Sequence, residues 1–390
     1  MRVVGLISGT SMDGIDVAAA EFQLHDDQIE LAPLGEIGVQ YQPALRAALE
    51  AALPPAPTSA EAICRLDNEV GRAFANAARG ALDGFASQAD LVVSHGQTLY
   101  HWVETGDARG TLQIGQPAWI AEETGLPVVA DLRTADIAAG GQGAPLASIF
   151  DVLLLQSRAR TCAALNLGGI ANVTVVGPGL EPIAFDTGPA NTLIDAAVRH
   201  ITDGMQSYDR GGEIAREGEI HRPLLDRLLS DPYYRLPPPK TTGRELFHLP
   251  YLLEAVDDVG PVGPEDLVAT VTYLTARTVG DACRERGVEE IVVSGGGAGN
   301  PFLLELLARE LADVTVQPID DLGIPAGFKE AYFIAMIGFL TMNGLAGNVP
   351  SATGASRPVI LGALWPGASG LLLPPTAKVK PATLRILNPG

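Results

Sequence analysis

The chain has 390 residues, 47% of them hydrophobic, which is enough to bury the cores of two or more domains. Its 26 basic and 46 acidic residues give a formal net charge of −20, which argues against general binding to nucleic acid or to membranes. Three widely spaced cysteines form neither a disulfide framework nor a zinc-binding spacing, and without a signal-type start or a transmembrane-length apolar run we expect a cytoplasmic protein.

The segment Ser8–Asp16 is the first candidate site. It joins two apolar runs, Val3–Ile7 and Ile15–Phe22, so we predict a strand, a tight turn and a second strand. Glycines in such a turn let backbone N–H groups approach a ligand, hydroxyls donate to phosphate oxygens, and an aspartate can hold a metal ion. The pattern is typical of a phosphate-binding turn, and an ordinary polar hairpin is the alternative.

A long helix is predicted next. Thr58 and Glu61 have the spacing of a capping box, which places the start of the helix there. Leu66, Val70 and Phe74 recur at helical spacing after it. We therefore assign these three side chains to the core and give them no chemical role.

Polar side chains follow two further predicted strands. The strand Leu91–Val93 leads to His95 and Gln97, a hydrogen-bonding pair suited to a sugar or similar polyol. The strand Val128–Ala130 leads to three charged residues, Asp131, Arg133 and Asp136. The alternatives are a strand-end histidine bonded to backbone, and a solvated loop or structural ion pair.

The second half of the chain begins like the first. A strand Ala163–Leu167, a turn at Gly168–Ile170 and a returning strand Ala171–Val176 repeat the opening pattern. This weak internal repeat predicts two similar α/β domains, between which ligands tend to bind. We expect residues 1–131 with about 353–390 in domain I, and residues 132–352 in domain II.

Asp186 is the sharpest candidate in the second half. It follows an apolar strand and precedes Thr187-Gly188-Pro189, with a helix predicted from about Asn191. A carboxylate at a strand tip in an α/β sheet can act as a general base or hold a metal ion. A turn aspartate that caps the following helix is the alternative.

The sequence lacks the motifs of several other enzyme classes. The chain has no P-loop, no G-x-S-x-G elbow and no H-E-x-x-H pair. Gly295, Gly297 and Asn300 approach a dinucleotide-binding fingerprint, with Asp320 at the ribose-binding distance, but the third glycine is missing. Glu330 begins a helix from Phe328, where an acidic residue also simply favours the helix dipole.

Taken together, these segments resemble the anhydro-N-acetylmuramic acid kinase family. The resemblance covers residues 1 to about 366 in order: Ser8–Asp16, His95–Thr98, Ala130–Arg133, Gly140–Leu146, Asn166–Asn172, Phe185–Asn191, Pro239–Glu245, Ser294–Gly297, Lys329–Ala331 and Thr353–Ala355. It departs at Thr241, where serine is commoner, and either hydroxyl serves. The tail from Gly367 to Gly390 extends beyond the usual end of the family, and either pairs onto a sheet edge or stays loose.

The resemblance implies an α/β fold of two ribonuclease-H-like domains of the actin/hexokinase/Hsp70 type, with ATP in the inter-domain cleft. It implies a kinase that uses ATP, Mg²⁺ and water on 1,6-anhydro-N-acetylmuramic acid and gives N-acetylmuramic acid 6-phosphate and ADP. This reaction recycles bacterial cell wall. A homodimer is also implied, and the net charge separately predicts that neither nucleic acid nor membrane is a partner.

The resemblance also carries roles to particular residues. Asp186 would be the base that activates water, and Asp13 or Asp186 would hold Mg²⁺ through water. The sugar would contact His95, Gln97, Arg133, Asp136 and Glu330. The nucleotide would contact Gly9, Thr10, Ser11, Met12, Asp13, Gly14, Ile15, Asp16, Asn166, Gly168, Gly169, Asn172, Gly295, Gly296, Gly297 and Asn300.

Two competing functions stay open. Another sugar kinase of the same fold would phosphorylate an ordinary hexose and would have no need to activate water. A non-catalytic, ATP-switched binding protein would bind ATP without turning over a sugar. Such a protein usually carries a partner-binding domain or a polymerising surface, and the sequence shows neither.

Overall fold

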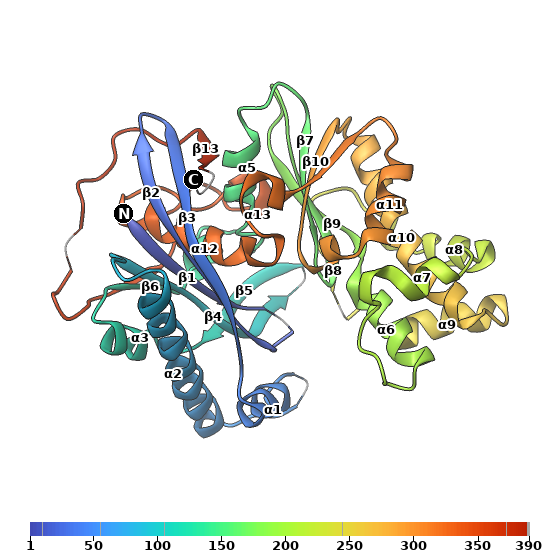
Figure 1. Cartoon of the computed structure of the whole chain (residues 1–390), viewed down its shortest axis with the longest axis horizontal. Helices are drawn as coiled ribbons and strands as arrows, with labels where there is room; N and C mark the ends of the chain where they lie inside the picture. The colour runs from blue at the N-terminus through green and yellow to red at the C-terminus, as the bar shows by residue number, and fades with distance from the viewer. Residues whose placement is uncertain (10, 55, 105, 244, 372, 388–390) are drawn as a thin grey trace. The chain divides into compact units, whose positions relative to one another are not determined.

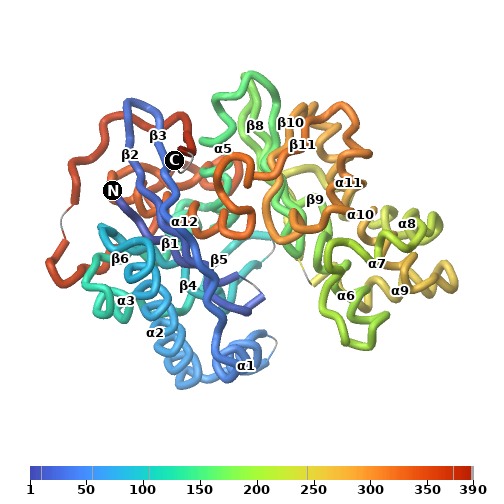
Figure 2. The backbone as a smooth tube through the Cα atoms, viewed as in Figure 1, coloured from blue at the N-terminus to red at the C-terminus, as the bar shows by residue number. Residues whose placement is uncertain are grey.

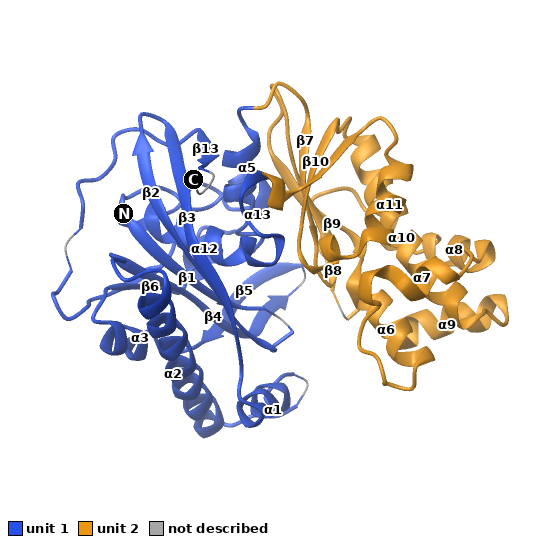
Figure 3. Ribbon diagram, viewed as in Figure 1, with its two compact units in different colours: residues 1–157, 322–390 blue, residues 158–321 orange. Residues whose placement is uncertain are grey.

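The computed structural model describes residues 1–390 except 10, 55, 105, 244, 372 and 388–390 (Figure 1). It divides into two compact units, unit 1 with residues 1–157 and 322–390, and unit 2 with residues 158–321 (Figure 3). The domain boundaries predicted from the sequence lie after residues 131 and 352, whereas the structure divides the chain after residues 157 and 321. The second boundary differs because α12 (Lys329–Met342) packs on strands β1, β2 and β4 and so belongs to unit 1.

Unit 1 is built on a mixed sheet. Its strands are β1 (Arg2–Ser8), β2 (Gly14–His25), β3 (Gln28–Gln40), β4 (Leu91–Glu104), β5 (Asp107–Ile114), β6 (Val128–Ala130), β12 (Ala363–Trp365) and β13 (Thr383–Ile386). The order is β12-β6-β4-β1-β2-β3-β13, and β5 pairs with β4. Strands β1, β2 and β3 form an antiparallel meander, whereas β4 and β6 run parallel to β1.

Helices of unit 1 pack on both faces of this sheet. They are α1 (Pro43–Ala51), α2 (Ala60–Gly84), α3 (Pro117–Thr124), α4 (Thr134–Ala138), α5 (Ser148–Leu155), α12, α13 (Pro350–Thr353) and the 3₁₀ turn Ala326–Phe328. The amphipathic α2 buries Leu66, Val70 and Phe74 against Val4 and Leu6. On the opposite face α12 approaches so closely that a Cβ at Gly5 would lie 2.1 Å from the Ala331 carbonyl oxygen. Both faces of β1 are therefore core.

Unit 2 repeats the arrangement of unit 1. Its strands are β7 (Cys162–Leu167), β8 (Ile170–Val176), β9 (Ile183–Pro189), β10 (Glu290–Ser294) and β11 (Thr315–Pro318), in the order β11-β10-β7-β8-β9. Strands β7, β8 and β9 form an antiparallel meander, and β10 and β11 run parallel to β7. The same sequence of pairings orders β6-β4-β1-β2-β3, so the α/β fold and the duplication predicted from the glycine-turn hairpins are confirmed.

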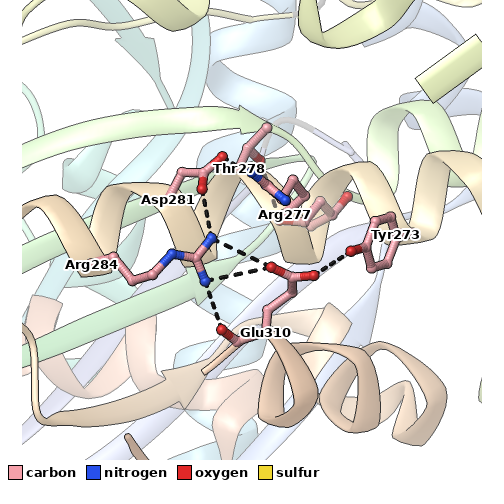
Figure 4. Close-up of polar contacts among 7 residues, drawn as sticks. Tyr273, Arg277, Thr278, Asp281, Arg284 and Glu310 are labelled. Atoms are coloured by element: carbon pink, nitrogen blue, oxygen red, sulfur yellow. Dashed lines mark hydrogen bonds and ion pairs between the residues drawn. The ribbon is translucent and has the colours of Figure 1, made fainter. Parts of the chain in front are cut away.

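Helices complete unit 2. They are α6 (Asn191–Ile201), α7 (Glu213–Glu217), α8 (Arg222–Leu229), α9 (Leu249–Val259), α10 (Pro264–Glu285) and α11 (Pro301–Glu310), with 3₁₀ turns Arg210–Gly212, Pro232–Arg235, Gly296–Gly299 and Ile319–Leu322. A polar cluster joins α10 to α11 (Figure 4). In it, Arg284 donates to Asp281 Oδ1 at 2.5 Å and to the Glu310 carbonyl oxygen at 2.6 Å, and Tyr273 donates to the Glu310 carboxylate. In the described part of the chain no helix combines the length and apolarity needed to cross a membrane.

Three local predictions need correction. Ser59 rather than Thr58 caps α2, because its Oγ accepts from the Ala62 N–H at 3.1 Å. Strand β4 continues to Glu104 because its second half pairs with β5, and β9 continues to Pro189 because it pairs with β8. His95, Gln97 and Asp186 therefore lie within strands rather than after them.

The C-terminal tail adds a strand to unit 1. Strand β13 runs parallel to the first residues of β3, and the Leu387 N–H donates to the Leu31 carbonyl oxygen at 2.8 Å. Figure 2 shows the tail returning to this edge of the sheet. Of the two predicted alternatives, pairing onto a sheet edge is the one observed for residues 383–386.

Candidate functional site

The turn between β1 and β2 is shaped by buried contacts and exposed at its tip. Ser8 Oγ lies 2.7 Å from the Gly14 carbonyl oxygen and 2.6 Å from Gln97 Oε1, which ties the turn to β4. Ser11 and Asp13 are exposed, and Ser11 Oγ donates to Asp13 Oδ1 at 2.7 Å. Thr10 lies outside the described residues. The turn therefore presents a hydroxyl and a carboxylate to solvent, while the buried contacts of Ser8 hold it in place.

Asp16 lies on β2, just beyond the turn, and is half-buried. Burial raises the pKa of its carboxyl group to about 6, and the negative charges of Glu330 and Asp13 add to the rise. Asp16 is therefore a carboxylate that can exchange a proton close to neutral pH.

His95 and Gln97 have different partners. His95 is 3% exposed, and its Nε2 lies 3.2 Å from Arg133 Nε and 3.1 Å from Arg133 Nη2. Burial, with the nearby Arg133 charge, lowers the pKa of His95 well below its usual value, so the ring is neutral. Gln97 is completely buried, and its Nε2 donates to the Gly9 carbonyl oxygen at 3.2 Å. Gln97 thus supports the first turn, whereas His95 belongs with Arg133.

The remaining predicted sugar contacts differ in exposure. Asp136 is completely buried, and its carboxylate accepts hydrogen bonds from Gly143, Asn348 and Thr353. Glu330 is exposed in the first turn of α12. Its neighbour Lys329 is buried and forms an ion pair with Asp151 at 2.6 Å. Of these acidic residues, Glu330 is the one placed to meet a ligand directly.

The turn between β7 and β8 holds the second glycine pair. Gly169 is exposed, and a Cβ there would lie 2.7 Å from Thr192 Oγ1. The turn is fastened to the start of α6, because the Asn191 N–H donates to the Gly168 carbonyl oxygen at 3.1 Å. Thr192 Oγ1 is buried and has no hydrogen-bond partner among the described residues. A small, open turn thus lies at the N-terminus of α6, which favours an anion.

Three hydrogen bonds hold Asp186 in place within unit 2. Its Oδ2 accepts from the Thr242 N–H at 2.9 Å, its own N–H donates to the Lys240 carbonyl oxygen at 2.9 Å, and its carbonyl oxygen accepts from Tyr233 Oη at 2.8 Å. Burial raises the pKa of Asp186 to about 6, the Thr242 N–H opposes this rise, and Glu245 adds to it. The carboxylate is therefore fixed in position and basic near neutral pH.

The Asp186 supports were not assigned from the sequence. Lys240 Nζ donates to the carbonyl oxygens of Tyr233 and Tyr234, both at 3.2 Å, and lies 4.7 Å from the centre of the Tyr233 ring. The irregular segment Pro239–Glu245 gave the only available signal, through the family resemblance. Arg244 in this segment lies outside the described residues.

The glycine turn after β10 packs tightly against β7. A Cβ at Gly295 would lie 2.4 Å from Asn166 Oδ1, and one at Gly297 would lie 2.7 Å from Leu167 Cβ. Asn300 caps α11, because its Oδ1 accepts from the Leu303 N–H at 3.1 Å. The side-chain oxygen of Asn300 is therefore engaged by the helix. Across the residues that the structure covers, no three His, Cys, Asp or Glu side chains gather to hold a metal ion.

Comparison with known proteins gives concordant matches. The model of the family described as anhydro-N-acetylmuramic acid kinase matches residues 1–367. The chain is 55% identical over 385 residues to the anhydro-N-acetylmuramic acid kinase of Streptomyces avermitilis, covering 98% of this chain and 99% of the relative. It is 53% identical over 389 residues to the enzyme of that name from Streptomyces coelicolor, covering 100% of both chains. The corresponding protein of Rhodococcus erythropolis is 51% identical over 394 residues, covering 99% of both.

Proposed function

The chain belongs to the anhydro-N-acetylmuramic acid kinase family, and from that premise we propose that it converts 1,6-anhydro-N-acetylmuramic acid, ATP and water into N-acetylmuramic acid 6-phosphate and ADP. The water oxygen bonds to C1 while the bond from C1 to O6 breaks. The freed O6 then takes the γ-phosphoryl group, and ADP leaves. This reaction serves peptidoglycan recycling and amino-sugar catabolism.

The geometry of Asp186 is the observation that carries the proposal. A general base must be ionised at the working pH and still basic enough to take a proton. Asp186, with its pKa raised to about 6 and one carboxylate oxygen held by the Thr242 N–H, meets both conditions. Among the described residues no hydrogen bond reaches its Oδ1, which is the atom that we assign to accept the proton from water.

The glycine turns are proposed to bind the nucleotide. Phosphoryl transfer depends mainly on positioning and on neutralising charge, and backbone N–H groups in small turns supply both. The tip of the first turn, where Gly9 is half-buried and Ser11 and Asp13 are exposed, suits the β- and γ-phosphates. Gly168–Gly169 at the start of α6 suits a second phosphate contact. The turn Gly295–Gly297, where side chains would clash, is assigned to the adenosine.

The sugar is proposed to bind to unit 1 through His95, Arg133 and Glu330. His95 has a buried ring nitrogen, Nδ1, without a partner among the described residues, and Glu330 is exposed. Gln97 and Asp136 are completely buried, with polar atoms engaged by the protein, so we assign them supporting roles instead. This assignment revises the expectation that all five residues touch the sugar.

The donor set fits Mg²⁺. This ion prefers oxygen ligands, keeps several waters and binds through one or two carboxylates together with phosphates. Asp13 offers an exposed carboxylate in the phosphate turn, and Asp186 offers one in unit 2. When bound, Mg²⁺ would neutralise phosphate charge. We propose that one of these carboxylates holds the ion through water, as the family resemblance implies.

The proposal is tested by coupled ADP release with Mg-ATP and the anhydro sugar, on the wild type and Asp186→Asn. Sugar-dependent ADP release that collapses in the variant would support both the reaction and the base. Release with an ordinary hexose but not with the anhydro sugar would indicate another sugar kinase. ATP binding without sugar-dependent release would indicate a binding protein. Gel filtration tests the homodimer, which we propose from the family resemblance alone. Cell fractionation tests the cytoplasmic location, which we propose from the cysteine usage and composition of the sequence.

A further inference from the structure

Asp136 binds three segments of unit 1 together. Its Oδ2 accepts from the Gly143 N–H at 2.8 Å, and its Oδ1 accepts from Asn348 Nδ2 and Thr353 Oγ1, each at 2.7 Å. We call these four residues the Asp136 cluster. Asp136 is completely buried and its carboxylate oxygens are engaged by these protein donors, so we assign it no contact with a ligand, yet it lies within a stretch that the sequence singled out. A buried carboxylate with three donors is strongly fixed in position.

The Asp136 cluster fixes the loop that follows α4. The Gln142 N–H donates to the Thr353 carbonyl oxygen at 2.8 Å, which adds a second link between the loop and the segment 348–353. A Cβ at Gly141 would lie 2.2 Å from Asp136 Oδ2, so the loop can approach the carboxylate only with glycine there. These contacts account for two family motifs, Gly140–Leu146 and Thr353–Ala355, that the proposed chemistry does not use.

The loop in turn holds Arg133. Gly143 donates its N–H to Asp136, and its carbonyl oxygen accepts from Arg133 Nη1 at 2.7 Å. Arg133 then directs Nε and Nη2 at His95 Nε2. A guanidinium group has donors and no acceptor, so Nε2 must be the acceptor. The neutral ring therefore carries its proton on Nδ1, which is buried and has no partner among the described residues.

We propose that Asp136 is a positioning residue of the sugar site, which acts through Gly143 and Arg133 to fix His95 as the Nδ1–H tautomer. The site then offers the substrate an N–H donor and selects a group with an acceptor oxygen at that position. A group that brings a donor, such as an ammonium, is disfavoured there because two donors would meet. This inference rests on the proposed function for its substrate, but the tautomer itself is a property of the free protein.

The tautomer is measured by NMR of the full-length protein with ¹⁵N-labelled histidine, and His95→Gln identifies the signal among the six histidines. The wild type should show a protonated Nδ1 and an unprotonated Nε2. In Asp136→Asn the side-chain N–H₂ must face one of the groups that donate to the carboxylate in the wild type. The loop then no longer holds Arg133 in place through Gly143, so His95 should show a mixture of tautomers. A folded Asp136→Asn protein with the wild-type His95 signal would overturn the proposal.

A milder pair of variants guards against misfolding. Thr353→Val removes the hydroxyl donor and keeps the shape, whereas Thr353→Ser keeps the donor. We expect Thr353→Val to move the His95 signal toward the mixture and Thr353→Ser to leave it in place. The same signal in both would overturn the proposal even if Asp136→Asn does not fold.

Kinetics provide the second measurement. Asp136→Asn and Thr353→Val should raise KM for the anhydro sugar about tenfold, the effect of one lost hydrogen bond, with KM for ATP changed less than about twofold. Equal loss for both substrates would point to general damage and contradict the positioning role. If the wild type does not turn over the sugar at all, the proposed function fails, and the NMR result alone decides the role of Asp136.

Discussion

The Thr242 N–H donates to Asp186 Oδ2 at 2.9 Å across 56 positions of sequence. This bond lowers the pKa of the carboxyl group, while burial and Glu245 raise it, and the balance lies at about 6. The group is thus ionised at neutral pH and becomes protonated as the pH falls through 6.

The first prediction concerns the pH profile. Because Asp186 must be ionised to act as a base, kcat/KM for the sugar should fall tenfold per pH unit below about 6. Asp16 also has a pKa of about 6, so Asp16→Asn serves as the control. The acidic limb should persist in Asp16→Asn, whereas Asp186→Asn should lose roughly 10²–10⁴ in kcat. An acidic limb that vanishes in Asp16→Asn would reassign the base.

The second prediction concerns Lys240. Lys240→Met keeps most of the stem but removes the donors to the Tyr233 and Tyr234 carbonyl oxygens, so the segment that holds Asp186 should loosen. We expect kcat to fall about tenfold, because small displacements of a base are costly. Lys240→Arg retains a donor and should lose less. Equal activity of Lys240→Met and the wild type in the ADP-release assay would refute the supporting role.

The third prediction compares two helical glycines. A Cβ at Gly338 of α12 would lie 2.1 Å from Val93 Cγ2, whereas nothing lies within 4 Å of one at Gly80 of α2. Gly338→Ala should lower the free energy of unfolding by about 1–3 kcal/mol through overpacking. Gly80→Ala should raise it by up to about 1 kcal/mol, because alanine favours the helix. Urea denaturation measures both, and the same sign for the two variants would contradict the packing described.

The fourth prediction concerns the buried ion pair of Lys329 with Asp151. Removing the cation in Lys329→Met leaves a buried carboxylate without this partner, which should cost roughly 3–5 kcal/mol of unfolding free energy. Lys329→Met combined with Asp151→Leu should recover part of the loss, since no charge then stays buried at this position. A double variant less stable than the single one would show that Asp151 depends mainly on other contacts.

The fifth prediction concerns the tail. Strand β13 covers the first residues of β3, and an uncovered strand edge invites pairing with other molecules. Deleting residues 368–390 should therefore increase light scattering and lower Tm by a few degrees. Specific activity of the remaining monodisperse protein should be retained, because none of the proposed site residues lies in the tail. Unchanged scattering would show that β3 is protected in another way.

Much of the fold could be predicted because its signals are local. The apolar runs around Ser8–Asp16 and Gly168–Ile170 predict both hairpins, and the structure contains them. The partners of Asp136 could not be predicted, because Asn348 and Thr353 lie 212 and 217 positions away. Nothing near Asp136 in sequence distinguishes a buried carboxylate from one that meets a ligand, so its placement among the sugar contacts followed from the resemblance alone.

The two units differ in how their residues are distributed along the chain. Unit 2 is one continuous stretch, residues 158–321, whereas unit 1 needs residues from both ends. The buried helix α12 and strands β12 and β13 all come after unit 2 in sequence. During synthesis from the N-terminus, unit 2 can therefore complete its core while the sheet of unit 1 still lacks one covering helix. In chains stalled on the ribosome with residue 321 exposed, residues 158–321 should be protected from protease, whereas residues 1–157 should still be cleaved.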